Sequence, residues 1–182
     1  EAQNKNLQAI AITNVVSSSI ARQVEEGIYQ RIGPEISVAS TKAFTSKATL
    51  LLMLAVQLGR HHNISPLESI GYIKQIRRIP ELVEQTLEHR DEIRELAAKL
   101  QLYDVMDFLG RQYMYPIALE GALKLKEITY MDSHAYASGE IKHGPLALVR
   151  DGRAIFFLAS QASLKDKNIS NMKEIAARGA DT

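Results

Sequence analysis

Short apolar segments alternate along this chain with longer segments of helical periodicity, and this alternation constrains the fold more than any other feature. Five segments are predicted as strands: 7–13, 27–32, 105–110, 136–138 and 154–160. Helices are predicted at 19–24, from about Ser40 or Thr41 to Arg60, and at 165–177. Strands that alternate with helices are typical of an α/β fold around a parallel sheet. We therefore expect parallel strands with helices packed on their faces.

The middle of the chain changes character: it carries apolar residues at helical spacing and many charges. Ser65–Glu68 is a capping-box pattern with proline at the first helical position. From there to Leu100 we predict two helices, separated at Pro80. Such a segment is typical of a helical connector packed on something larger.

Composition excludes several classes of protein. The chain has 182 residues and no cysteine, which excludes disulfides, zinc–thiolate sites and thiol nucleophiles. Its formal net charge of +1 gives no basic excess for nucleic acid or for a membrane surface. The polar N-terminus is unlike a signal peptide, and no apolar run approaches the roughly 20 residues of a membrane span. We expect a cytoplasmic protein without nucleic-acid or membrane partners.

The segment ALEGALKLKEITYMDSHAYASGEIKHGPLAL, residues 118–148, places charged groups inside a helix suited to a core. At about 100° per residue, Glu120, Lys124 and Glu127 fall on one narrow stripe. Leu123 and Ile128 flank it, which favours a charged line that faces a cleft between apolar walls. A carboxylate in such a cleft can transfer protons. The alternative is ordinary Glu–Lys pairing on an exposed helix, worth about 0.2–0.5 kcal/mol.

The loop G-E-I-K-H-G-P follows this helix and adds titratable groups. Gly139 and Gly144 permit unusual backbone conformations, and His143 between them has a side chain that titrates near neutrality. A single histidine can be structural or catalytic, and both interpretations remain open from the residues alone.

Five hydroxyl residues cluster around the start of the long helix that begins near Ser40. The hydroxyl residues are Ser37, Ser40, Thr41, Thr45 and Ser46. Hydroxyls and free backbone N–H groups at a helix N-terminus suit an anionic or polyhydroxyl ligand. N-capping is the alternative, but it needs only one of these residues.

Motifs for common cofactors and metals are absent. There is no G-x-G-x-x-G, P-loop, H-E-x-x-H or G-x-S-x-G pattern. We expect neither a cofactor nor a metal site. The adjacent His61 and His62 are interpreted as surface residues.

Two segments, GPEISVASTKAFTS and LGRQYMYPIALEGALKLKEITYMDSHAYASGEIKHGPLAL, resemble the isomerase part of the glucosamine-6-phosphate synthase family, the isomerizing glutamine–fructose-6-phosphate aminotransferases. The resemblance spans nearly the whole chain. It implies flavodoxin-like α/β sugar isomerase (SIS) domains with a parallel sheet and flanking helices. It also implies that 1–62 is the C-terminal part of a first SIS domain, 63–102 a helical connector, and 103–182 the N-terminal part of a second.

The same resemblance implies an activity and catalytic roles. The family converts fructose 6-phosphate and glutamine-derived ammonia into glucosamine 6-phosphate for hexosamine biosynthesis. Glu127 matches the base that moves a proton between C1 and C2 of the sugar, and Lys124 matches an active-site lysine. His143 matches the ring-opening histidine, which one subunit of a homodimer supplies to its neighbour.

Substrate contacts are implied at Val38 and Ser40, with Glu35 nearby. Other parts of the family's machinery are expected outside this chain: an S-Q-S-G-E-T type phosphate loop upstream of Leu7, a Schiff-base lysine downstream, and a glutaminase domain. We therefore expect an excerpt of a longer protein that has little or no activity alone.

Two alternatives to this function remain. One is another SIS phosphosugar isomerase or deglycase, and the other is a non-catalytic SIS module that senses a sugar phosphate. Glu127 favours an enzyme, because a sensor needs no base. The strands, two from one SIS domain and three from the next, are expected to form one permuted sheet or to pair with a second copy.

Overall fold

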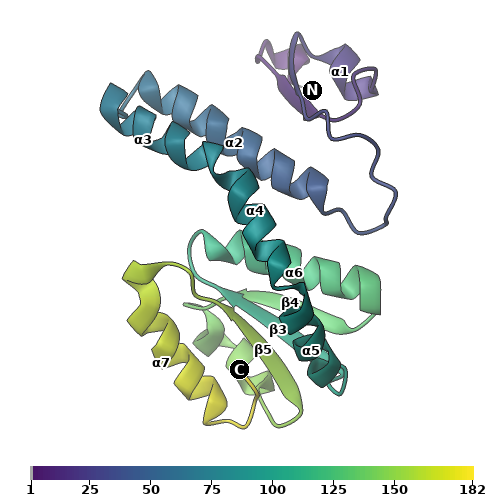
Figure 1. Cartoon of the computed structure of the whole chain (residues 1–182), viewed down its shortest axis with the longest axis vertical. Coiled ribbons are helices and arrows are strands. Elements are labelled where there is room, and N and C mark those ends of the chain that lie inside the picture. Colours follow the sequence, from purple (N-terminus) through teal and green to yellow (C-terminus); the bar gives the residue numbers. More distant parts are fainter. Residues whose placement is uncertain (1) are drawn as a thin grey trace. The chain divides into compact units, whose positions relative to one another are not determined.

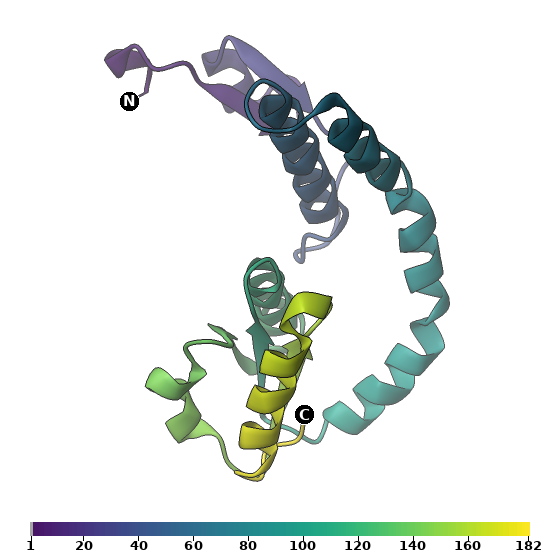
Figure 2. The same cartoon turned by 90° about the vertical axis from the view of Figure 1, so that its left-hand side faces the viewer.

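Two separate parallel sheets organise the chain, one in each of two structural units, Glu1–Glu88 and His89–Thr182. The computed structural model describes residues 2–182, with the backbone alone at residue 3, and Figures 1 and 2 show its elements. Both sheets are parallel and carry helices, so the predicted α/β class is confirmed.

The first unit holds a two-stranded sheet and a set of helices. Its elements are η1 (Gln3–Lys5), β1 (Ile10–Thr13), α1 (Ser19–Gln23), β2 (Glu26–Tyr29), α2 (Lys42–Arg60), α3 (Pro66–Arg77) and α4 (Ile79–Glu88). The Ser18 side chain caps α1 by accepting from the Ala21 N–H. The carboxyl end of β1 is tied to the segment after β2 by Asn14, which donates to the Gly33 carbonyl (2.6 Å) and accepts from the Ile32 N–H (3.1 Å).

The helical middle of the chain contains three helices, where two were predicted. They are α3, α4 and α5 (Arg90–Leu100). The predicted capping box is present, because Ser65 accepts from the Glu68 N–H and the Glu68 carboxylate accepts from the Ser65 N–H. The break predicted at Pro80 lies two residues earlier, at Arg78, since proline is tolerated in the first turn of a helix but not in its interior.

The second unit contains the larger sheet. Its elements after α5 are β3 (Val105–Gly110), α6 (Met114–Thr129), β4 (Asp132–Ala137), η2 (Ile141–His143), η3 (Pro145–Leu148), β5 (Arg153–Leu158), η4 (Ala162–Leu164) and α7 (Lys165–Ala176). The strand order is β4-β3-β5, and the register aligns the carboxyl ends at Gly110, Ala137 and Leu158. Ligand sites in such sheets form beyond this edge.

The helices α6 and α7 lie on opposite faces of this sheet (Figure 1). On one face a buried cluster unites the sheet with α7 and the segment after β4; it consists of Leu109, Ile141, Val149, Ile155, Ile175 and Ala180. On the other face Phe108 and Phe156 stack at 4.9 Å, and Gly121 of α6 lies so close to Phe108 that a Cβ would be 3.0 Å from its ring. The close approach of α6 therefore depends on glycine at position 121.

The structure corrects two expectations about the strands. Of the two arrangements expected, one permuted sheet is wrong, because within residues 2–182 each strand pairs only with strands of its own unit, and pairing with a second copy stays a prediction. The strand expected at 136–138 is longer and begins at Asp132. Its first half was missed because its polar residues, such as Asp132, are uncommon in strands. Here Asp132 and Ser133 pair with β3.

Candidate active site

The charged stripe of α6 forms a connected group of side chains. The Lys124 Nζ lies 2.8 Å from Glu127 Oε2 and 3.4 Å from Glu120 Oε1. The three side chains are only 20–28% exposed. The predicted alignment is confirmed, and the pairing is half-buried, unlike the fully solvated pairs that contribute little.

The two carboxylates influence the protonation of Lys124. Its hydrogen bond to Glu127 raises the pKa of the ammonium, partial burial lowers it, and Glu120 raises it again. The net effect is a raised pKa, so Lys124 carries a full positive charge at neutral pH. A fixed cation thus lies within hydrogen-bonding distance of a carboxylate that one turn of helix holds in place.

Apolar side chains flank the stripe on both sides. Leu119 and Leu123 are 47% and 43% exposed, and Ile128 on the opposite side is 64% exposed. The apolar side chains that flank the stripe are therefore exposed on α6, and the cleft expected between apolar walls stays a prediction. This helix turns both its charges and these apolar groups away from the sheet.

His143 ends the 3₁₀ helix η2, in the segment that follows β4. Its side chain is exposed, whereas its neighbour Ile141 is 2% exposed and packs in the core. Gly144 has φ +148°, a backbone conformation that favours glycine and turns the chain directly after the histidine. In the described part of the chain, no hydrogen bond or ion pair joins His143 to Lys124 or Glu127.

Glu35 is the centre of the hydroxyl-rich turn in the first unit. Its Oε2 accepts from the Ser40 hydroxyl (2.8 Å), and its Oε1 accepts from the Thr41 N–H (2.8 Å) and hydroxyl (3.4 Å). These donors, the Thr41 N–H first, lower the pKa of the Glu35 carboxyl. The structure thus brings Glu35 and Ser40 together, while Val38 is 88% exposed.

Sequence reasoning did not anticipate that Glu35 would engage this turn. Glu35 stands five residues before Ser40, and no short-range pattern marks a carboxylate that accepts from the start of a later helix. Of the other hydroxyls, Thr45 donates to the Thr41 carbonyl (3.3 Å). His61 and His62 are both exposed just beyond α2, as predicted.

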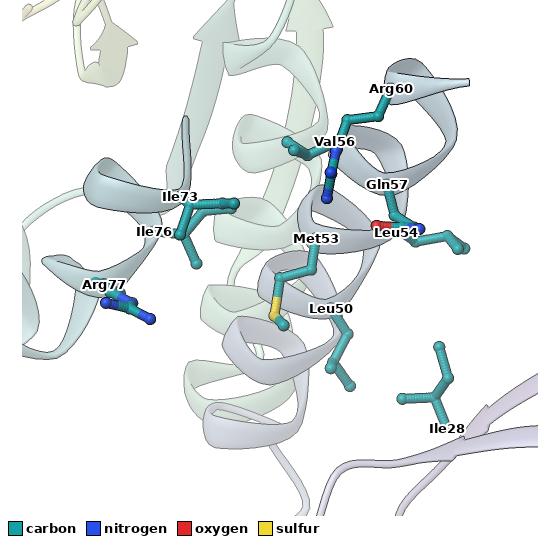
Figure 3. Close-up of a pocket in the computed structure, with 10 residues that line it drawn as sticks. All are labelled: Ile28, Leu50, Met53, Leu54, Val56, Gln57, Arg60, Ile73, Ile76 and Arg77. Carbon is teal, nitrogen blue, oxygen red and sulfur yellow. The ribbon is translucent and has the colours of Figure 1, made fainter. Parts of the chain in front are cut away.

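A pocket of ≈ 550 Å³ lies within the first unit, between β2, α2 and α3 (Figure 3). Apolar side chains such as Leu50, Met53 and Ile73 line it, with the guanidinium groups of Arg60 and Arg77. None of the residues predicted to bind substrate lines this pocket. Its apolar walls match the interior of a domain better than a sugar site, which requires polar partners.

Two further searches concern residues 2–182 only. No group of three or more histidine, aspartate or glutamate side chains is placed to hold a metal ion there. Among the same residues, no helix has the length and apolar character needed to cross a bilayer.

Known proteins resemble this chain along its length. It is 44% identical over 181 residues to the isomerizing glutamine–fructose-6-phosphate aminotransferase of Clostridium tetani, with 99% of this chain covered. The enzyme of the same name from Methanothermobacter thermautotrophicus is also 44% identical over 181 residues, with 98% covered. The chain spans only about 30% of the length of these curated relatives.

Solved structures give the same result. The C-terminal domain of glucosamine-fructose-6-phosphate aminotransferase from Francisella tularensis matches 98% of this chain and 51% of its own, with a TM-score of 0.93 and 37% identity. Glucosamine-6-phosphate deaminase from Thermotoga maritima matches 98% and 52%, with a TM-score of 0.76 and 25% identity. A family model described as SIS domain matches residues 1–57 and 104–182. The chain therefore belongs to the SIS domain family.

Proposed function

We propose that this chain supplies proton-transfer and sugar-binding residues of an enzyme that converts fructose 6-phosphate and glutamine-derived ammonia into glucosamine 6-phosphate. The observation that carries the proposal is the half-buried group of Glu120, Lys124 and Glu127 on α6. The name shared by the relatives from C. tetani and M. thermautotrophicus supports it.

Glu127 is the proposed base. Conversion of a ketose into a 2-amino aldose requires that a proton leave C1 and that one be added to C2. A single carboxylate on one face of the sugar can do both. Within the described residues, only Oε2 of Glu127 is engaged, by Lys124, and Oε1 is available to accept a proton.

Lys124 is proposed to stabilise negative charge that develops on the sugar as the proton leaves C1. Its ammonium is held by carboxylates one turn away on either side, so it needs little reorganisation during the reaction. A lysine with a raised pKa suits this electrostatic role and not that of a neutral nucleophile.

His143 is proposed to open the sugar ring by proton transfer. Its exposure and its lack of contact with Lys124 or Glu127 in the described residues are compatible with action in the site of a neighbouring subunit. We propose a homodimer for this reason. Ser40 and Val38 are proposed to contact the substrate, with Glu35 holding the turn that presents them.

The domain division proposed from the resemblance is 1–62 and 103–182 for parts of two SIS domains and 63–102 for their connector. In relatives about three times longer, further segments accompany this region. We propose that a phosphate loop, a Schiff-base lysine and a glutaminase domain outside these 182 residues complete the enzyme, and that the chain alone has little or no activity.

The test is an assay of the complete gene product with fructose 6-phosphate and either glutamine or ammonium. We expect glucosamine 6-phosphate from the complete protein and none above background from the 182-residue chain. Turnover by the chain alone near that of the complete protein would contradict the incomplete site. Failure of the complete protein to form product would contradict the function.

A second function is favoured by the likeness to a glucosamine-6-phosphate deaminase from T. maritima. Such an enzyme would use the same carboxylate to move a proton from C2 to C1 and would release ammonia. The same assay distinguishes the two, because a deaminase consumes glucosamine 6-phosphate without glutamine. A non-catalytic sensor would bind the sugar phosphate and catalyse neither reaction.

A further inference from the structure

The segment 138–146, which carries His143, is fastened to α7 along its length. At its start, the Asn171 side chain donates its Nδ2–H to the Ser138 carbonyl in a buried hydrogen bond. Four residues further on, Lys142 Nζ donates to Glu174 Oε1 at 2.8 Å. We name this segment the histidine loop.

The end of the histidine loop is held by the same helix. Arg178, just beyond α7, donates from Nη1 to the Leu146 carbonyl at 3.4 Å. Asn171, Glu174 and Arg178 are spaced by three and four residues, so they lie within about 60° of one another around the helix axis. Two contacts from one face of α7 and a third from the turn just beyond it therefore meet the loop at three points, four residues apart.

Burial gives the histidine loop an inner and an outer side. Ile141 and Ile175 are 2% and 0% exposed and belong to the same core cluster. Asn171, which donates to the loop backbone, is also buried, at 7% exposure. The outer side carries His143 and Gly144, both exposed. The inner side is fixed by packing and hydrogen bonds, and His143 lies between the attachments at Lys142 and Leu146.

We propose that α7 supports the histidine loop, with Asn171, Glu174 and Arg178 as positioning residues that hold His143 ready for reaction. None of the three touches the sugar in this account; they act through the loop backbone and Lys142. The expected effect on catalysis rests on the proposed function of His143. The expected effect on the order of the loop does not.

The three contacts differ in strength. The bond from Asn171 is buried, and its loss leaves the Ser138 carbonyl without a partner, which is the costly case. The Lys142–Glu174 pair is 54% and 36% exposed and so contributes less. We therefore expect the effects of substitution to decrease from Asn171 to Glu174.

Hydrogen exchange of the 182-residue chain tests the mechanical part. Asn171→Ala should speed amide exchange in the histidine loop about tenfold relative to β3. Asn168→Ala is the matched control, because Asn168 is a buried asparagine one turn earlier on α7 with no hydrogen bond to the loop in the described residues. It should leave the ratio of loop to β3 exchange unchanged.

A second pair of variants protects the test against a general loss of folding. Glu174→Gln removes the negative charge from one surface contact and should speed loop exchange about twofold, whereas Asp166→Asn on the first turn of the same helix should not. If Asn171→Ala and Glu174→Gln leave loop exchange as in the unaltered chain, or speed β3 equally, the proposal is wrong.

Kinetics of the complete protein test the catalytic part. A 5-deoxy analogue of fructose 6-phosphate lacks the hydroxyl that closes the furanose ring, so it needs no ring opening. Asn171→Ala should slow turnover of fructose 6-phosphate about tenfold and leave the analogue nearly unaffected. Equal slowing of both substrates would contradict a positioning role. Absence of turnover in the unaltered protein would instead refute the proposed function, and exchange would still decide the role of α7.

Discussion

Glu35 in the first unit and Glu127 in the second are both glutamates near predicted substrate positions, but their surroundings differ. Glu35 accepts three hydrogen bonds from its own turn, through both oxygens. Glu127 shares one oxygen with Lys124, and in the described residues no hydrogen bond engages the other. A carboxylate occupied by its own backbone holds a loop, whereas one with a free oxygen on a rigid helix can accept a proton.

Asp107 of β3 is the most buried of these three carboxylates. It is 2% exposed, its Oδ2 lies 3.0 Å from Arg153 Nη1, and its Oδ1 lies 3.7 Å from His134 Nδ1. Burial raises the pKa of Asp107, and the positive charge of Arg153 opposes this. Three carboxylates thus have three surroundings: Glu127, the proposed base, has a free oxygen on a helix, Glu35 holds a turn, and Asp107 is paired in the core.

Removing the proposed base should have the largest effect. Glu127→Gln keeps the size of the side chain and its acceptor for Lys124 but removes its basicity. We expect turnover in the complete protein to fall by about 10²–10⁴-fold, with little change in thermal stability. Glu120→Gln is the control on the same stripe, and an equal loss there would remove the distinction between the two glutamates.

Breaking the buried ion pair of Asp107 and Arg153 should have the largest effect on folding. Asp107→Ala leaves Arg153, 13% exposed, without its partner and should lower the free energy of unfolding by about 3–5 kcal/mol. Urea unfolding of the chain measures this. The double variant Asp107→Leu with Arg153→Met should recover most of the loss, because an apolar pair needs no charge compensation. A small effect of Asp107→Ala would show that the pair is solvated.

Loosening the first turn should have a moderate effect on substrate binding. Glu35→Gln cannot accept equally well from the Ser40 hydroxyl and the Thr41 N–H, so the turn should become less ordered. We expect KM for fructose 6-phosphate to rise several-fold and kcat to change less. A fall in kcat as large as that of Glu127→Gln would make Glu35 a catalytic group.

Low pH should have the smallest effect, a loss of order confined to the turn that Glu35 holds. The pKa of Glu35 is lowered from 4.5 by donors that bind its charged form. The stabilisation is therefore complete above pH 4.5 and is lost as pH falls through the lowered folded pKa. The amide chemical shift of Thr41 should report this transition, and Glu35→Gln should abolish it. A Thr41 shift that titrates above pH 4.5 would contradict this assignment.

The local sequence pattern was enough to predict some strands and not others. The strand at 105–110 was predicted with its bounds, since apolar residues flank its one charged residue, Asp107, on both sides. The polar start of β4 was missed because its strand conformation depends on the neighbouring strand. Ser133 is 0% exposed there, and His134 lies beside Asp107 of β3. Strand pairing across units cannot be deduced from a strand count, and the expected single sheet was wrong.

The candidate site divides in the same way. The stripe of α6 was predictable, because the angle between residues depends only on a helix being present. The bonds of Glu35 and the attachment of the histidine loop to Asn171 depend on tertiary contacts 5 and 33 residues apart in sequence. The roles of Glu127, Lys124 and His143 stay predictions.

Solvent deuterium incorporation tests the role of Glu127 most directly. The complete protein, supplied with fructose 6-phosphate and ammonium in D₂O, should form glucosamine 6-phosphate that carries deuterium at C2 in the fraction of turnovers in which the Glu127 carboxyl exchanges its proton with solvent before returning it. Glu127→Gln should abolish this incorporation while Glu35→Gln retains it at a reduced rate. Incorporation by Glu127→Gln at the rate of the unaltered protein would show that another group moves the proton.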